Sequence, residues 1–157
     1  MMTFNRRKFL TTTLIAPLPL VAAGQLWADD HDIWSVQETH DALNNNAARL
    51  IDVRRPDEWN ETGVAQGAWP LDMTEAAFGQ RLFAALDLAG GQPVALICAV
   101  GGRSGYIMGQ LRQRQVTGFI DVAGGMMGSR GNPGWIASGL PVVTAEVALA
   151  ALPTSLI

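Results

Sequence analysis

The middle of the chain contains two short, nearly unbroken apolar runs. They are RLIDV at residues 49–53 and PVALIC at residues 93–98. A strand with one solvated face alternates apolar and polar residues, whereas a strand buried on both faces of a parallel sheet reads as a continuous apolar run. The pattern therefore predicts two buried parallel strands. Weaker strand patterns lie at 33–36 and within 118–125.

Segments with helical spacing lie between the predicted strands. Residues 37–46 and 75–91 have this spacing, and two glycines stop the second helix. Pro56 fits the first turn of another helix, which Gly63 can end. Strands that alternate with helices predict an α/β domain with a mostly parallel sheet. The apolar face at 75–91 consists of Phe78, Leu82, Ala85 and Leu86, and that of a helix after the second run consists of Ile107, Met108 and Leu111.

The length and composition fit one folded domain. The chain has 157 residues, of which 48% are hydrophobic and 16% charged. A chain of this length can bury one real core but is short for two domains. We predict an export signal at 1–28, a domain at 29–144 and a tail at 145–157, which can form one or two helical turns against the body.

The first 28 residues have the three-part pattern of an export signal, with a basic start, an apolar middle and small residues near the end. Arg6 and Arg7 resemble a twin-arginine signal, and a general secretory signal is the alternative. A membrane anchor is disfavoured, because the apolar stretch at 9–23 is shorter than the ~20 residues of a spanning helix. We expect cleavage after Ala28 or after Ala23, and a periplasmic or otherwise exported domain without a stable membrane anchor.

Removal of this signal makes the chain more acidic. Three of the 11 basic side chains and none of the 14 acidic ones lie before residue 29, which leaves 8 basic side chains and a net charge of −6. A nucleic-acid partner needs a basic patch on the domain. The charge therefore argues against nucleic acid as a partner.

Cys98 is the only cysteine of the chain. It cannot form a disulfide within the chain, so it is either a buried, inert residue or a free thiol kept for its reactivity. With one cysteine and two histidines, we expect no metal site. We also expect no cofactor.

A glycine-rich turn follows Cys98. Gly101 and Gly102 can adopt backbone angles that are closed to other residues, so that several N–H groups point into one concavity. These donors, the start of the following helix and Arg103 would all stabilise a thiolate. The turn therefore favours a reactive Cys98 over an inert one.

Three stretches of the chain resemble, in order, the signatures of single-domain members of the rhodanese family of sulfurtransferases. They are LIDVRRPDEWNETGVAQGAWPLDM at 50–73, ALICAVGGRS at 95–104 and GFIDVAGGMMGSRGNPGWIASGLPV at 118–142. The likeness covers about residues 33–143. The resemblance implies a rhodanese-like α/β fold with a five-stranded, mostly parallel sheet and helices on both faces.

The same resemblance implies roles for the residues around the turn. Cys98 would be the sulfur-accepting nucleophile, the segment Ala99–Arg103 its cradle of backbone donors, and Ser104 a residue that closes the loop. Asp52 matches an aspartate at a strand end, where it either supports the loop beside the arginine or only ends the strand. Glu58 matches an acidic position of the family, and a solvated helix face is the stronger interpretation for it.

The implied reaction moves sulfane sulfur from thiosulfate or a persulfide to a thiophilic acceptor, through a persulfide at Cys98. A partner protein can also be the acceptor. One alternative is a sulfur carrier or redox sensor that acts on a protein partner without turnover. Another is a phosphatase or arsenate reductase, whose loop is C-x5-R. Cys98 to Arg103 is C-x4-R, a smaller cup that suits a sulfur atom.

Two features depart from the family pattern. Thiosulfate users often carry a basic or polar residue directly after the cysteine, whereas Ala99 and Val100 follow it here. The chain is also longer after the last glycine pair. There, Met126, Met127 and Arg130 are either part of the mouth of the site, or core methionines and a solvated arginine. We expect thiosulfate to be a poor donor.

Overall fold

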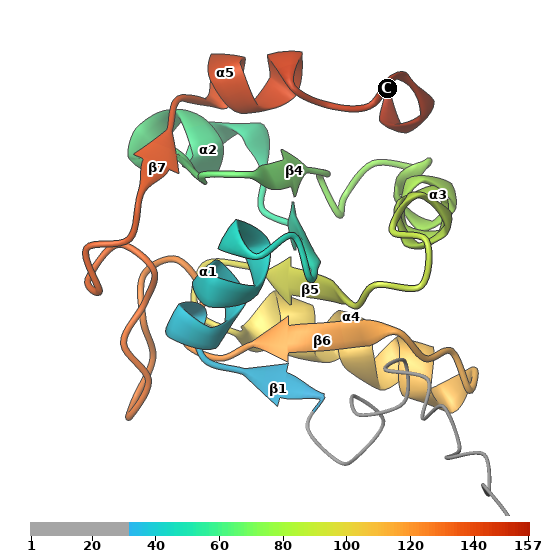
Figure 1. Ribbon diagram of the computed structural model, residues 1–157, viewed down its shortest axis with the longest axis horizontal. Coiled ribbons are helices and arrows are strands. Elements are labelled where there is room, and N and C mark those ends of the chain that lie inside the picture. Colours follow the sequence, from blue (N-terminus) through green and yellow to red (C-terminus); the bar gives the residue numbers. More distant parts are fainter. Residues whose placement is uncertain (1–31) are drawn as a thin grey trace, which may run out of the picture. The chain divides into compact units, whose positions relative to one another are not determined.

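A five-stranded parallel sheet lies at the centre of the fold (Figure 1). The computed structural model describes residues 32–157, so the expected export signal lies outside the described residues. The strand order is β1-β6-β5-β2-β4, and all neighbours run parallel. The expected α/β architecture is therefore confirmed. The strands are β1 (Ile33–Trp34), β2 (Arg49–Asp52), β4 (Ala68–Pro70), β5 (Val94–Ile97) and β6 (Phe119–Val122).

Helices cover both faces of the sheet, as expected. α3 (Phe78–Leu88) and α4 (Gly102–Gln113) pack into one hydrophobic cluster with the strands. α1 (Val36–Asn44), α2 (Pro56–Thr62) and α5 (Ala145–Ala150) pack into the other. In Figure 1, α4 lies behind the sheet and α1 in front of it. Within residues 32–157, no helix combines the length and apolarity that crossing a membrane needs.

The two central strands, β2 and β5, are buried on both faces. Ile51 and Leu96 belong to the cluster on the α3 and α4 side. Leu50 and Ile97 belong to the cluster on the opposite side. Full burial of such a side chain contributes about 1.5–3 kcal/mol. Burial on two faces is the reason why both runs contain almost no polar residue.

Local signals in the sequence set where several helices begin and end. Ser35 caps α1: its Oγ accepts the Glu38 N–H at 3.1 Å, and the Glu38 carboxylate accepts the Ser35 N–H at 2.8 Å. α2 has Pro56 in its first turn and ends at Gly63, as predicted. α3 begins at Phe78, three residues later than the pattern indicated.

Two features at the C-terminal end complete the fold. β3 (Val64–Ala65) and β7 (Val142–Val143) form a two-stranded antiparallel sheet that the sequence did not predict, because two residues are too few to show a pattern. The tail forms α5 and a 3-10 turn, η1 (Thr154–Leu156). Leu156 is fully buried, and its carbonyl oxygen accepts a hydrogen bond from Arg81 of α3 at 2.7 Å. The tail thus packs on the body, as expected.

Candidate active site

Cys98 directly follows β5, at the carboxyl end of a central strand. The strands on either side of β5 end at the same edge, because the register pairs Ile97 with Asp52 of β2 and Leu96 with Asp121 of β6. Functional groups in parallel α/β sheets gather beyond such ends. The topology therefore brings the loops after three strands to one place.

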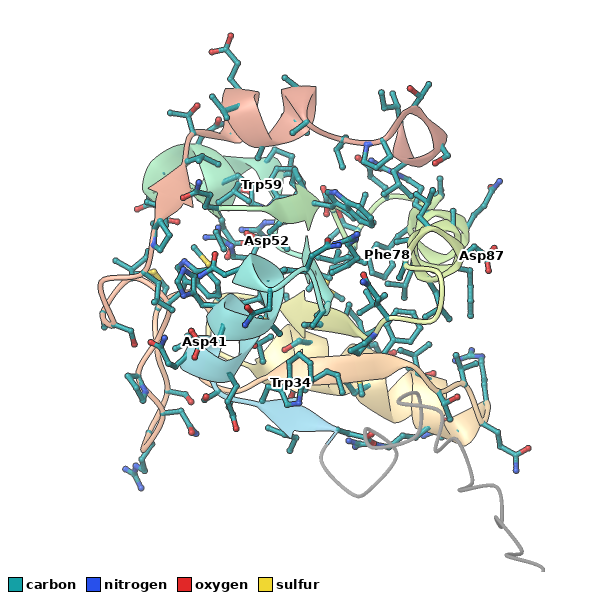
Figure 2. The ribbon with its side chains drawn as sticks, in the orientation of Figure 1. Trp34, Asp41, Asp52, Trp59, Phe78 and Asp87 are labelled. Atoms are coloured by element: carbon teal, nitrogen blue, oxygen red, sulfur yellow. The ribbon has the colours of Figure 1, made fainter. Side chains whose placement is uncertain are left out.

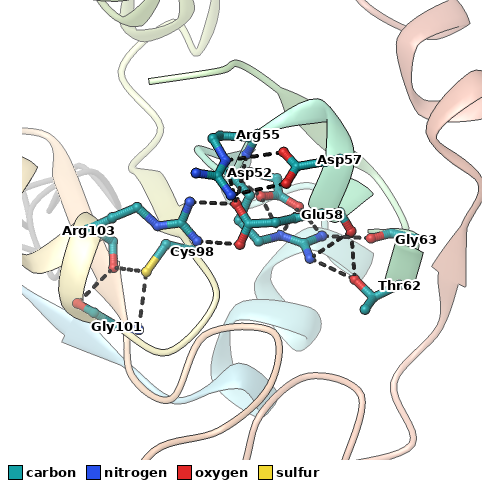
Figure 3. A network of polar contacts seen from close by, with 11 residues as sticks. Asp52, Arg55, Asp57, Glu58, Thr62, Gly63, Cys98, Gly101 and Arg103 are labelled. Carbon is teal, nitrogen blue, oxygen red and sulfur yellow. Dashed lines mark hydrogen bonds and ion pairs between the residues drawn. The ribbon is translucent and has the colours of Figure 1, made fainter. Parts of the chain in front are cut away.

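The sulfur of Cys98 accepts two hydrogen bonds. The Gly101 N–H donates to Sγ at 3.1 Å and the Ser104 hydroxyl at 3.5 Å (Figure 3). Gly101 has a φ of 91°, a left-handed conformation that favours glycine, and it is the N-cap of α4. Hydrogen-bond donors and a helix N-terminus both stabilise negative charge. Two members of the expected loop thus point donors at the thiol, which is fully buried.

The loop after β6 supports this turn. The N–H groups of Met126 and Met127 donate to the carbonyl oxygens of Cys98 and Ala99, both at 2.8 Å. Gly125 has a φ of 61° and packs so closely that a Cβ there would lie 2.5 Å from the Cys98 carbonyl oxygen. Two backbone hydrogen bonds therefore hold the turn, and only a glycine at position 125 allows the loop after β6 to approach it this closely.

Two exposed apolar side chains belong to the cysteine loop or lie next to it. Val100 and Met127 are 52% and 53% exposed. The backbone N–H of Met127 donates to the Ala99 carbonyl oxygen of the loop. Met126 is fully buried in the core and Arg130 is exposed. Met126 is therefore a core methionine, which was one of the two interpretations of this segment. Met127 instead lies on the surface beside the loop.

Arg103 is bound to Glu58 across the site. The guanidinium donates to both carboxylate oxygens, at 2.6 and 2.5 Å (Figure 3). This hydrogen bonding to Arg103 is the main reason why the pKa of Glu58 falls to about 2. The expectation of a solvated helix face for Glu58 was wrong. The reason is that α2 places Glu58 beside Arg103, in the first turn of α4, so that its carboxylate is paired with the guanidinium.

Asp52 is bound to a different arginine. Its carboxylate accepts from Arg54 Nη2 at 2.8 Å, and Arg54 also donates to Thr62 Oγ1 at 2.7 Å and to the Gly63 carbonyl oxygen at 2.6 Å. Burial raises the pKa of Asp52, and the Arg54 guanidinium opposes that rise. Asp52 and Trp59 lie near each other in Figure 2, and the indole also contributes to lowering this pKa. Asp52 therefore holds the β2–α2 connection rather than the cysteine loop.

Sequence reasoning missed Arg54. Two adjacent arginines follow β2, and the sequence offers no sign that they differ. In the structure Arg54 is 1% exposed, whereas the Arg55 side chain is 53% exposed and donates to Asp57 at 3.0 Å. The only signal for the burial of Arg54 was its position two residues after the end of the buried strand β2, where a side chain can still lie inside the fold.

The charged groups next to the loop balance one another. Arg103 is paired with Glu58, and Arg55 is paired with Asp57 and lies 3.8 Å from Glu58. Two cations and two anions therefore leave no net charge at this place. Among the residues that the structure describes, no three His, Cys, Asp or Glu side chains are grouped as metal ligands would be.

Comparison with known proteins agrees with this geometry. The family model of the rhodanese-like domain matches residues 35–130, and the chain therefore belongs to the rhodanese-like family. No curated protein sequence matches the chain. A rhodanese-related protein from Thermoplasma volcanium is 25% identical, with a TM-score of 0.53, and the match covers 70% of this chain and 95% of that chain.

Two more distant solved structures share the fold. A thiosulfate sulfurtransferase from Pseudomonas aeruginosa is 19% identical, with a TM-score of 0.56, over 73% of this chain and 20% of that chain. The polysulfide-sulfur transferase homodimer from Wolinella succinogenes is 24% identical, with a TM-score of 0.51, over 71% of this chain and 77% of that chain. At these identities the likeness shows the fold alone.

Proposed function

We propose that this protein is a sulfurtransferase that moves sulfane sulfur from a donor to a thiophilic acceptor through a persulfide at Cys98. One observation carries the proposal: the sulfur of the chain's only cysteine accepts hydrogen bonds from Gly101 and Ser104 at the carboxyl end of a central strand. A cysteine that serves only as a small apolar core residue has no need of such donors. Membership of the rhodanese-like family supports the same reaction class.

The reaction has two balanced steps. The Cys98 thiolate attacks the outer sulfur of the donor, a new S–S bond forms, and the old bond breaks as the leaving group departs with its electron pair. That group is sulfite from thiosulfate, or a thiolate from a persulfide. An acceptor nucleophile then takes the outer sulfur, and the electron pair of the S–S bond returns to Cys98. Both steps place negative charge on sulfur beside the Gly101 N–H, which stabilises it.

The charges around the mouth favour a persulfide donor over thiosulfate. Thiosulfate is a dianion and gains from a free cation, but Arg103 is committed to Glu58, and Ala99 carries no charge. The exposed apolar side chains of Val100 and Met127 suit a less charged donor. A small persulfide, or a partner protein that presents one, is therefore the donor that we propose.

The central test is the variant Cys98→Ser. We expect it to fold as the wild type does, to gain no sulfur atom when it is incubated with donor, and to lose sulfur transfer. Intact mass shows the sulfur loading, a donor–acceptor assay shows the transfer, and denaturant unfolding shows the fold. Sulfur transfer that survives in this folded variant would end the proposal.

A second candidate is a sulfur carrier or redox sensor that does not turn over. The exposed apolar pair Val100 and Met127 beside the thiol favours a protein as partner. Both candidates need the same thiol, so turnover separates them. Many cycles with a small acceptor identify the enzyme, whereas one stoichiometric loading and discharge identifies the carrier.

We also propose that the protein works outside the cytoplasm. The support is the pattern of its first 28 residues, with the paired arginines and the short apolar stretch. A lone reduced thiol in an oxidising compartment fits a residue that is regenerated in each reaction cycle.

A further inference from the structure

A tight hairpin follows the loop that supports the cysteine turn. The backbone N–H groups of Ser129 and Asn132 each donate to the carbonyl oxygen of the other residue, at 2.9 and 3.0 Å, so that Arg130 and Gly131 form the tip. Gly131 has a φ of 84°, a conformation that two-residue hairpin turns use. We call residues 128–134 the hairpin. In Figure 1, the orange segment between β6 and β7 extends outward beyond the carboxyl ends of the strands.

The hairpin is anchored at both of its ends. Met126 on one side and Trp135 on the other are fully buried. The Met126 N–H also donates to the Cys98 carbonyl oxygen at 2.8 Å. A Cβ at Gly134 would overlap the Gly128 nitrogen, so the two arms of the hairpin are in close contact at its base. The hairpin therefore has a fixed position relative to the cysteine loop.

Arg130 is the only arginine in residues 32–157 whose side chain has no hydrogen-bond or ion-pair partner. Arg49 and Arg114 bind uncharged groups, and the other five arginines pair with carboxylates. Arg130 is exposed and is the only charged residue between Asp121 and Glu146. The hairpin thus carries an uncompensated positive charge on a chain whose residues 29–157 have a net charge of −6.

Three exposed apolar side chains flank the base of this hairpin. They are Val100 of the cysteine loop, Met127 and Ile136. Backbone bonds join them to one unit, because the Met127 N–H donates to the Ala99 carbonyl oxygen and the Ile136 N–H to the Met126 carbonyl oxygen. An apolar centre with a charged group at its edge is the usual composition of a protein–protein interface.

We propose that the hairpin, Val100, Met127 and Ile136 form a docking surface for the protein that exchanges sulfur with Cys98, and that Arg130 binds an acidic side chain of this partner. A small donor has to reach the buried sulfur, beside which the cations are already paired, whereas a protein covers the cysteine loop and the hairpin together. The net negative charge repels an acidic partner elsewhere, so that Arg130 also orients it. The proposal rests on the proposed function only in taking Cys98 as the group that exchanges sulfur.

The test is an NMR titration of the isotope-labelled protein with a short synthetic peptide, in which a serine lies between two leucines and two glutamates. Serine in place of cysteine excludes a reaction with Cys98, so the titration measures binding alone. We expect the backbone amide signals of Met127 and Gly131 to shift. The same peptide with glutamines in place of the glutamates should bind roughly 2- to 5-fold more weakly, as one exposed charge contact allows. Added salt should remove this difference.

Three variants assign the preference for the acidic peptide to one residue. Arg130→Gln should abolish the preference, and Arg130→Lys should keep it. Arg114→Gln is the matched control, because Arg114 is also exposed and binds no carboxylate, but it lies at the opposite end of α4 from the cysteine loop. It removes the same charge from the molecule and should leave the preference unchanged.

Equal binding of the two peptides, or equal effects of Arg130→Gln and Arg114→Gln, would overturn the proposal. Shifts of the same amide signals by inorganic sulfate at the peptide's concentration would also overturn it, in favour of a small anion. Shifts on concentrating the protein alone would do so in favour of a second copy of this chain. A peptide with cysteine in place of the serine then reports transfer: binding as expected without any transfer of sulfur to this cysteine would contradict the proposed function alone.

Discussion

The Glu58 carboxylate ties the cysteine loop to a helix that is distant in the sequence. It binds Arg103, 45 positions further along the chain, through two hydrogen bonds. Arg103 directly follows the glycine turn, so the pair fixes the turn against α2. Solvent reaches both side chains, which are 19% and 31% exposed, and screening makes such a pair weaker than a fully buried one.

We predict that Glu58→Gln lowers the free energy of unfolding by about 1 kcal/mol at neutral pH, after allowance for solvent screening. The pKa of Glu58 falls from 4.5 to about 2 on folding. Its stabilising effect is therefore complete above pH 4.5 and is lost as the pH falls through about 2, below which the two proteins should become equally stable. Urea unfolding across this range measures the difference. Glu61→Gln, on the exposed face of the same helix, is the control; an equal loss there would contradict the role of the ion pair.

Among the elements, the C-terminal turn η1 closes the apolar cluster beside α3. Leu156 is fully buried in that cluster, whereas its neighbour Ile157 is 85% exposed. We predict that Leu156→Ala costs about 2–5 kcal/mol in the free energy of unfolding. Ile157→Ala should change it by less than about 0.5 kcal/mol. If denaturant unfolding gives both variants the same stability, the tail does not contribute to the fold.

On the scale of the whole molecule, we expect charge to influence which donor loads the thiol. Residues 29–157 carry a net charge of −6, and the ion pairs beside the cysteine loop cancel one another. A dianion therefore meets no attraction, and at low salt it is repelled. A monoanionic persulfide is affected less.

We predict that Ala99→Arg raises kcat/KM for thiosulfate relative to a small persulfide by about 2- to 5-fold, as one exposed charge contact allows. The gain should shrink with added salt. Ala99→Gln supplies similar bulk without charge and should leave the ratio of the two kcat/KM values unchanged. A wild-type enzyme that prefers thiosulfate would contradict the charge argument and would point to Arg103 or Arg130 as the binding group.

The mature form is also a property of the whole molecule. We predict that the protein purified from the envelope fraction of its native host begins at Asp29, or at Gly24 if the earlier site is used. Intact mass and N-terminal peptide analysis measure this directly. Replacement of Arg6 and Arg7 by lysine should abolish export by a twin-arginine route and leave a general secretory route active. An intact Met1 in the cytosolic fraction would contradict the proposed location.

The sequence by itself determined the architecture and the position of the thiol. The runs at 49–53 and 93–98 predicted buried parallel strands, because burial on both faces excludes polar residues. The glycines after Cys98 predicted the tight turn, because their conformations are closed to other residues. These properties depend on residues that are neighbours in the chain, so they can be predicted from the sequence without knowledge of the tertiary structure.

Only the tertiary structure decided which charged residues face each other. Glu58 and Asp52 are both carboxylates within the stretch at 50–73, yet Glu58 binds Arg103 and Asp52 binds Arg54. Asp121 was not singled out from the sequence, although its carboxylate lies against Gly105 of α4. Ion pairs depend on the orientation of a side chain relative to an element distant in the sequence, and that orientation is set by how α2, α4 and β6 pack on the sheet. A single sequence carries the charges but not the packing that pairs them.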